Sequence, residues 1–286
     1  MQARLKILLS CLTALALSPA FAGEPSQPAG AQRQLLQPPK LAIASPITDR
    51  FALRGLFYMP DISTAVRNDN SAGVPGTLVS GEDTLGFPRK LKQGSVDIMF
   101  RIGDRHRIRA DFFKMTRSGD EVINQQIRFG EDVYQINDRL VSSMDLRKLG
   151  LAYSYSVLRT EKWELGAGVA LHLLQLQGAL EVPARFEREK LDVAGPFPTL
   201  TADATWRVTR RFSLNLAGNY LGANQEGVKG GYQSWHGDAQ FRVRPNFAVG
   251  LGYTQARFKV DAATTDFAGY FNLHYKGPEA FVRVSF

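Results

Sequence analysis

The sequence has a single cysteine and only four histidines, and after its first 22 residues it has no apolar run long enough for a spanning helix. A helix that crosses a bilayer takes about 20 consecutive apolar residues, which excludes a helical membrane protein for the rest of the chain. The histidines fall in different segments and lack the spacing of a zinc-binding pair. No glycine-rich phosphate loop is present. We therefore expect no metal site and no cofactor.

The amino-terminal residues have the organisation of a secretory signal. Arg4 and Lys6 form a basic region, Ile7 to Leu17 is apolar, and Ala20-Phe21-Ala22 is a cleavage site of the A-x-A type. Residues 1–22 are therefore predicted to be a signal peptide, and its removal takes the only cysteine with it. The mature chain then needs no disulfide in an oxidising compartment. A lipoprotein signal ending at the cysteine is less favoured, because almost no apolar core would precede it.

Residues 23–49 are rich in proline, with Gly, Ser and Gln between the prolines. Such a segment cannot bury enough apolar area to fold alone, so we expect a disordered periplasmic leader. Its short run 41–47 can dock on the following domain or serve as a plain linker. The formal charge of the chain is +8, and it falls to +6 without Arg4 and Lys6. Lys and Arg are spread over many segments rather than gathered in one patch, which argues against nucleic-acid binding.

From residue 50 onward, apolar and polar residues alternate in about ten segments. Strict alternation places the two faces of a strand in different environments. The segments lie near 51–59, 92–102, 106–117, 139–158, 163–178, 198–208, 211–223, 231–243, 246–260 and 267–286. Strands that span a membrane must pair all their backbone groups, which requires a closed sheet. Residues 50–286 are therefore predicted to be all-β and to form a single antiparallel transmembrane β-barrel of about ten strands.

The lengths of the connections predict how the barrel is oriented. Four joins are short turns, and the others are longer, the longest being 60–91 and 118–138. Short turns on the periplasmic side and longer loops outside are usual in such barrels. Both termini are then periplasmic, and the strand number is even. Eight strands result if the first segments fail to pair, and twelve if 60–91 forms another hairpin.

The last segment ends on an aromatic carboxy-terminal residue. It runs from Glu279 to Phe286, and Ala280, Val282 and Val284 make up its apolar face. This tail resembles the terminal strand of bacterial outer-membrane β-barrels, and the resemblance of the small-barrel class covers about residues 50–286. It implies an outer-membrane location and contact with outer-membrane lipids and lipopolysaccharide. It also implies that Phe286 is an assembly signal for the barrel-assembly machinery.

A five-residue repeat, in which an acid precedes an arginine by four residues, occurs at the predicted periplasmic end of four strands. Residues four apart in a strand share a face, so both charges point inward, roughly 13 Å apart. An unpaired charge in a narrow lumen is costly, and we expect a salt-bridge network between strands. Its members are Asp97 and Arg101, Asp203 and Arg207, Asp238 and Arg242, and Glu279 and Arg283. Replacing Arg207 alone is expected to leave a buried acid unpaired. An ion pathway is the alternative interpretation.

Ser234, His236 and Asp238 share the inward face of one predicted strand. A serine, a base and an acid on one wall suggest nucleophilic catalysis. Alternate side chains lie ~6.6 Å apart, however, which is beyond hydrogen-bond reach, so partners such as His172 or His274 are needed from other strands. The sequence has neither the motif of outer-membrane lipid A deacylases nor that of omptin proteases. A satisfied polar interior is the favoured interpretation.

The strand number also limits the function. Barrels of about eight strands are filled by side chains, whereas those of roughly sixteen or more leave a water channel. The small inward residues, such as Gly166 and Gly252, are expected to make room for the arginines or to leave a local pocket. We expect a non-enzymatic barrel with a charge-filled, narrow lumen that acts through envelope structure or its surface loops. A channel for ions or small solutes and a surface hydrolase are the alternatives, and the oligomeric state stays open.

Overall fold

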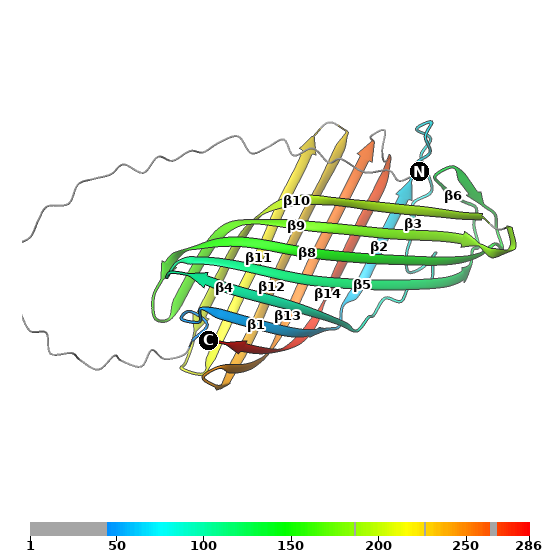
Figure 1. Cartoon of the computed structure of the whole chain (residues 1–286). Coiled ribbons are helices and arrows are strands. Elements are labelled where there is room, and N and C mark those ends of the chain that lie inside the picture. Colours follow the sequence, from blue (N-terminus) through cyan, green and yellow to red (C-terminus); the bar gives the residue numbers. More distant parts are fainter. Residues whose placement is uncertain (1–44, 186, 226, 264–267) are drawn as a thin grey trace, which may run out of the picture.

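The computed structural model describes residues 45–185, 187–225, 227–263 and 268–286. The predicted signal peptide and most of the predicted leader lie outside the described residues. Ten strands form a closed antiparallel barrel in the order β1-β4-β5-β8-β9-β10-β11-β12-β13-β14, and β14 pairs with β1 (Figure 1). The predicted all-β fold with ten barrel strands is confirmed. No helix among the described residues is long and apolar enough to cross a membrane.

The bounds of the strands follow the alternation of the sequence closely. The barrel strands are β1 (Phe51–Tyr58), β4 (Gln93–Ile102), β5 (His106–Val122), β8 (Arg139–Arg159), β9 (Trp163–Val182), β10 (Glu187–Arg207), β11 (Phe212–Gln225), β12 (Val228–Arg244), β13 (Phe247–Ala263) and β14 (Ala268–Ser285). β10 begins about ten residues before its predicted start, so most of the connection expected between segments 163–178 and 198–208 belongs to the β9–β10 hairpin. The remaining elements are β2 (Asp61–Asn68), β3 (Val79–Ser80), β6 (Ile127–Phe129), β7 (Asp132–Tyr134) and the single-turn helix η1 (Pro183–Arg185).

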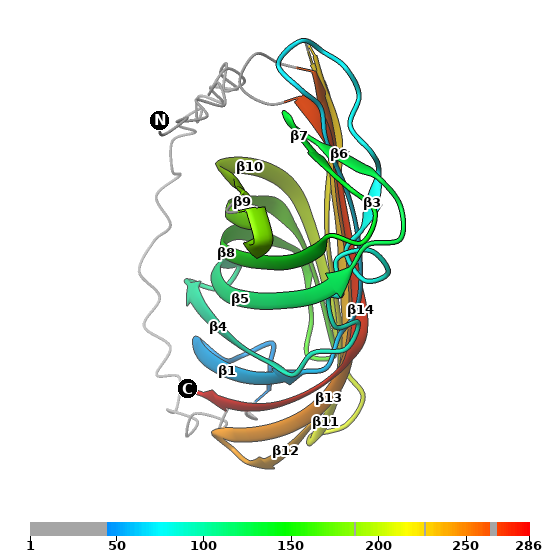
Figure 2. The same ribbon diagram turned by 90° about the vertical axis from the view of Figure 1, so that its right-hand side faces the viewer.

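Away from the short turns, the barrel opens into two sheets. β1 pairs with β14 only as far as Tyr58–Glu279, and beyond this point β14 pairs with β2 from Lys276–Asp61 onward. The long connection 60–91 thus adds β2 and β3 to the sheet without changing the strand number of the barrel. β10 and β11 pair from Arg207–Ser213 to Leu200–Tyr220, and then they separate. In Figures 1 and 2, the long β5, β8, β9 and β10 cross over the sheet of β11 to β14.

Part-way along each long strand, the apolar residues change from the outward face to the inward face, as β8 illustrates. Near the turns, its outward residues are apolar and exposed: Leu149, Leu151, Tyr153 and Tyr155. Nearer the loops, the outward residues are polar, and the inward ones are the buried Leu140, Met144 and Leu146. We call the part with apolar outward residues the membrane half and the part with polar outward residues the outer half. The membrane half has the lipid-facing pattern of a transmembrane barrel, and the outer half has that of a water-soluble β-sandwich.

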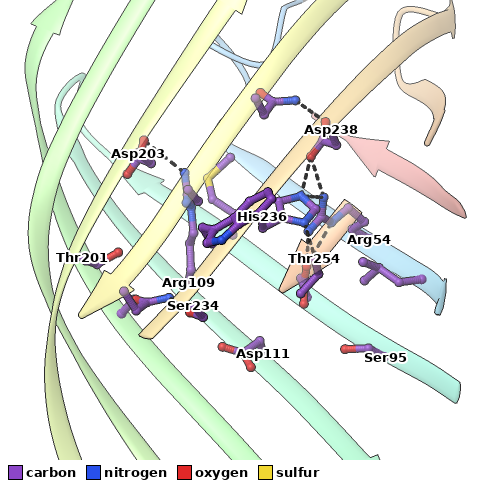
Figure 3. Close-up of a pocket in the computed structure, with 18 of the residues that line it drawn as sticks. Arg54, Ser95, Arg109, Asp111, Thr201, Asp203, Ser234, His236, Asp238 and Thr254 are labelled. Carbon is purple, nitrogen blue, oxygen red and sulfur yellow. Dashed lines mark hydrogen bonds and ion pairs between the residues drawn. The ribbon is translucent and has the colours of Figure 1, made fainter. Parts of the chain in front are cut away.

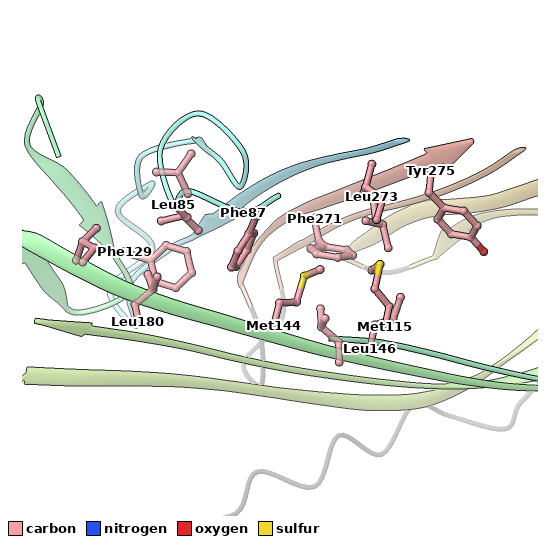
Figure 4. Packing of buried hydrophobic residues seen from close by; sticks show 14 of the residues in the cluster. Leu85, Phe87, Met115, Phe129, Met144, Leu146, Leu180, Phe271, Leu273 and Tyr275 are labelled. Carbon is pink, nitrogen blue, oxygen red and sulfur yellow. The ribbon is translucent and has the colours of Figure 1, made fainter. Parts of the chain in front are cut away.

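The outer half is filled by an apolar core between its two sheets (Figure 4). Met115 and Met144 come from one sheet and Phe271 and Leu273 from the other, all of them buried. The loop that follows β3 contributes Leu85 and Phe87, and Phe129 comes from the β6–β7 hairpin. Burial of a side chain of this size contributes about 1.5–3 kcal/mol. The core therefore holds the long loops to the sheets.

An aromatic girdle marks the edge of the membrane half at the short turns. Phe100, Trp206 and Phe241 are exposed on the outer surface, beside inward-facing arginines of the repeat. Trp206 stacks on Trp163 of the neighbouring strand, with ring centroids 5.0 Å apart. Aromatic side chains at this level are typical of the membrane–water interface.

Candidate functional site

The periplasmic end of the lumen is covered by residues assigned above to the leader. Ser45 to Asp49 form a turn whose residues are mostly buried. The Asp49 carboxylate accepts hydrogen bonds from Arg242, at 2.7 Å, and from Arg283, at 3.2 Å. Residues 45–49 of the predicted leader thus pack against the barrel, since the buried Asp49 pairs with two lumen arginines.

A second cluster of charges links strands that are not neighbours. Glu164 of β9 accepts two hydrogen bonds from Arg101 of β4, at 2.6 and 2.9 Å, and one from Ser156, at 2.5 Å. Arg107 of β5 lies 2.7 Å from Asp203 of β10 and 3.7 Å from Glu164. Arg101, Arg107 and Glu164 are at most 3% exposed. Because each charge faces one of opposite sign, the cluster avoids the cost of burying an unpaired ion.

A third cluster surrounds Arg54 of β1 (Figure 3). Its guanidinium lies 2.7 Å from Asp97 of the neighbouring β4 and 2.9 Å from Asp238 of β12. His236 donates or accepts at both ring nitrogens: Nε2 is 2.7 Å from Asp238, and Nδ1 is 2.9 Å from Thr254 and 3.4 Å from Glu279. The imidazole thus lies between two carboxylates.

The ion pairs of the repeat differ in part from those expected. Its acids and arginines pair with residues outside the repeat, namely Asp49, Arg54, Arg107, Glu164 and His236. Arg207 is an exception to the buried network, because its only ion pair among the described residues is with Glu161, at 3.8 Å, and Glu161 is 94% exposed. The expectation that Arg207 neutralises a buried acid is therefore wrong. Arg54 and Arg107 were missed, although both occupy inward positions of predicted strands.

The catalytic candidates are only partly brought together. The argument that residues two apart in a strand cannot bond fails for His236 and Asp238, because their side chains lean toward each other until the nitrogen and oxygen are 2.7 Å apart. Ser234 instead accepts a hydrogen bond from Asn219, at 3.1 Å. His172 bonds to Thr199, at 3.1 Å, and no contact joins it to His236. The described residues contain no cluster of His, Cys, Asp or Glu arranged to hold a metal ion.

Inward-facing glycines make room for these charges. A Cβ atom at Gly166 would collide with the Arg107 guanidinium and lie 2.9 Å from Asp203. A Cβ atom at Gly252 would lie 3.0 Å from Asp238 and 3.1 Å from Glu279. Around the second and third clusters the lumen also contains a cavity of about 280 Å³, lined by Arg109, Asp111 and Lys148 among others. The glycines thus make room for the charged side chains, while a pocket remains between the clusters.

A layer of aromatic rings separates this cavity from the core of the outer half. Phe113 stacks on Tyr275 at 5.7 Å, and Tyr58 meets Tyr275 edge-on at 6.2 Å. On the other wall, Phe197 and Tyr232 lie 5.3 Å apart, and both contact His172. These rings come from β1, β5, β9, β10, β12 and β14, so the aromatic layer reaches inward from all sides of the barrel.

The comparisons with known proteins agree with this architecture. No family model and no curated protein matches the chain. Among solved structures, the outer membrane protease OmpT from Escherichia coli superposes with a TM-score of 0.54 at 13% identity, over 82% of this chain and 97% of that chain. The chain therefore has the fold of a bacterial outer-membrane β-barrel. The likeness shows the fold alone, and it transfers no activity to the residues of this lumen.

Two further structures belong to the same class of membrane protein. The transport unit of the autotransporter AIDA-I from Escherichia coli has a TM-score of 0.41 at 11% identity, over 83% of this chain and 90% of that chain. Ail of Yersinia pestis has a TM-score of 0.35 at 8% identity, over 81% of this chain and 99% of that chain. The charged clusters described above lie inside the membrane half of the barrel.

Proposed function

We propose that this outer-membrane barrel is a non-enzymatic envelope protein with a closed lumen, which acts through the rigid outer half that it holds at the cell surface. The aromatic layer is the observation that carries this proposal. A continuous water path would have to pass the rings of Phe113, Phe197, Tyr232 and Tyr275 and then the packed core beyond them. At the other end it would have to pass the turn that Asp49 holds in place.

The charges of the lumen favour the same conclusion. Arg54, Arg101 and Arg107 each face a carboxylate within 3 Å. Ions that enter a narrow pore must exchange their water for protein ligands, so selectivity rings need charges that are free to meet them. Charges already paired across the barrel stabilise the fold and offer little to a passing ion. The narrow channel is therefore the less favoured alternative.

Single-channel recording in planar bilayers tests the closed lumen. The purified, folded wild-type protein is expected to give no conductance steps. A variant that combines Asp49→Ala with Phe197→Ala and Tyr232→Ala removes the turn's anchor and half of the aromatic layer, and it is expected to conduct. Phe100→Ala, on the lipid-facing surface, is the matched control and is expected to stay silent. Regular steps from the wild type would overturn the proposal in favour of a channel.

A hydrolase activity is tested separately at the third cluster. His236 is held between two carboxylates, and Ser234 bonds to Asn219 instead of to the imidazole. This arrangement supports a structural role, because a nucleophile needs its base within hydrogen-bond reach. The Ser234→Ala and His236→Ala variants are expected to have the same lipid and peptide hydrolysis background as the wild type. Loss of a wild-type hydrolytic activity in both would contradict a non-enzymatic role.

A further inference from the structure

The outer half bears a basic patch on the sheet formed by β13 and β14. Arg257 and Lys259 point outward from β13, and Lys276 points outward from β14, and all three are exposed. In the register of the two strands, Lys276 lies opposite Gln255, and Arg257 lies opposite His274. Lys276 and Arg257 are thus diagonal neighbours on one face, about 7–8 Å apart. Two long cationic side chains at this distance can reach a single anionic group.

The cations of the basic patch are not neutralised by the protein. Among the described residues, no carboxylate lies within ion-pair distance of Arg257, Lys259 or Lys276, although Asp61 is the strand neighbour of Lys276. Arg257 donates its Nε–H to Asn272, at 3.1 Å, which fixes the plane of the guanidinium and leaves its terminal nitrogens available. The ammonium of Lys259 lies 5.5 Å from the centroid of the Tyr270 ring.

The opposite sheet of the outer half is different. Three of its outward cations have acidic partners: Lys114 and Arg147 share Asp145, at 3.7 and 3.6 Å, and Arg139 lies 2.6 Å from Asp120. The three cations of the basic patch differ from these three because they form no ion pair among the described residues, as expected for a surface that meets an anionic partner.

The position of the basic patch relative to the membrane interface indicates which anionic partner it meets. Trp235 and Tyr253 are exposed on the same face and stack on each other, with ring centroids 6.1 Å apart. Such amphipathic rings lie at the level of the lipid headgroups. At a rise of ~3.3 Å per residue, Arg257 lies within roughly 13 Å of Tyr253 along its strand, on the loop side. The basic patch thus stands just above the acyl chains of the outer leaflet, where headgroup phosphates are found.

We propose that Arg257, Lys259 and Lys276 form a binding site for the phosphate groups of a phosphorylated glycolipid in the outer leaflet. The Arg257 fork offers two parallel donors to one phosphate, and Lys276 adds a point charge beside it. The apolar and aromatic surface below receives the acyl chains. This site lies on the strands, and it is independent of whether the lumen is closed.

Native mass spectrometry of the folded protein in detergent measures the affinity directly. The probes are lipid A with both phosphates, the same lipid A after dephosphorylation, and phosphatidylglycerol. We expect phosphorylated lipid A to bind at least about tenfold more tightly than either of the others. Equal affinity for dephosphorylated lipid A would overturn a phosphate site, and equal affinity for phosphatidylglycerol would reduce the patch to general attraction of anionic lipids.

Two matched variants locate the site. Arg257→Gln/Lys259→Gln/Lys276→Gln removes the basic patch, and Lys114→Gln/Arg139→Gln/Arg147→Gln removes the same charge from the other sheet. A cation near an anionic surface contributes about fivefold in affinity, so the first variant should bind phosphorylated lipid A on the order of 100-fold more weakly. The second should bind like the wild type. An equal loss in both variants, or no loss in the first, would refute the assignment, and Lys276→Gln alone provides the test if the triple variant does not fold.

Discussion

Arg101 and Glu164 form a two-pronged ion pair across the barrel interior, with nitrogen–oxygen distances of 2.6 and 2.9 Å and side chains that are each 1% exposed. They belong to β4 and β9, which do not pair with each other in the sheet. The pair therefore fixes the shape of the barrel cross-section. Backbone pairing between neighbouring strands alone would let this cross-section deform.

Glu164→Gln is expected to destabilise the barrel strongly. It leaves the buried guanidiniums of Arg101 and Arg107 without one of their carboxylates, and breaking a buried pair costs about 3–5 kcal/mol. Arg207→Gln is the matched control and should cost less than about 1 kcal/mol, because its partner Glu161 is exposed. Urea unfolding in detergent micelles, followed by tryptophan fluorescence, measures both. Similar midpoints for the two variants would contradict the buried network.

Gly166→Ala tests whether small residues make room for the charges. The added methyl group meets the Arg107 guanidinium and forces it away from Asp203. Overpacking of this kind costs about 1–3 kcal/mol. Gly55→Ala is the control, because its nearest neighbour is a Val282 methyl group at 3.9 Å on the lipid-facing side. Heat-induced unfolding on unboiled gels should occur earlier for Gly166→Ala only, and equal behaviour of the two variants would argue against close packing.

Arg117→Met should loosen the loop that follows β3 and packs into the outer half. The buried Arg117 guanidinium donates to Glu82, at 2.6 Å, and to the carbonyl oxygen of Pro88, at 2.8 Å. Without it, Glu82 is left buried and unpaired, which favours opening of the loop. Trypsin is expected to cleave after Lys90 or Lys92 on the order of tenfold faster in the variant.

The Arg139→Met variant is the control for this proteolysis. Arg139 pairs with Asp120 on the exposed surface, at 2.6 Å, and both side chains are about half exposed. Its loss should leave the rate of cleavage in the loop unchanged, since an exposed pair contributes about 0–1 kcal/mol. Equal cleavage of Arg117→Met and the wild type would show that the loop is held by its apolar contacts alone.

Phe286 is expected to have two separate roles, one in closing the barrel between β14 and β1 and one in assembly into the outer membrane. Its backbone oxygen accepts hydrogen bonds from Arg50 and Phe51, and its backbone nitrogen donates to Phe51, at 2.9 Å. Its side chain is 67% exposed. Phe286→Ala keeps these backbone bonds and should fold in detergent like the wild type, yet reach the outer membrane of cells in lower amount. Deletion of Phe286 should impair both, and normal insertion of Phe286→Ala would contradict the assembly signal.

Much of the barrel could be predicted from the sequence because its alternation has a period of two, which the strand geometry requires. Segments 92–102 and 246–260 match β4 and β13 closely for this reason. Alternation also continues through the outer half, but there the inward residues are apolar. The strands near the short turns follow from the pattern, but the outer ends of β5, β9 and β10 extend beyond the predicted segments. The division of the outer half into two sheets follows from long-range packing of the loop after β3.

The partners of the charges could not be predicted in the same way. Inward direction follows from the period, and Asp97, Asp238 and Glu279 line the cavity in the lumen. Which charge meets which depends on the stagger and diameter of the barrel, and neither is visible in a local pattern. His236 and Asp238 show a second limit of the sequence pattern. Their side chains lean toward each other, so the bonded nitrogen and oxygen lie much closer than the backbone spacing of alternate residues suggests.

The separation of β10 from β11 beyond Leu200–Tyr220 leaves a free edge on each strand. Exposed edges offer unpaired backbone groups to other chains and invite association. β10 carries Pro196 and Pro198 just past this point, and a proline has no N–H with which to bind an incoming strand. The two prolines thereby disfavour the addition of another strand to the free edge of β10. Neighbouring molecules in the same membrane are therefore not expected to join their sheets at this edge.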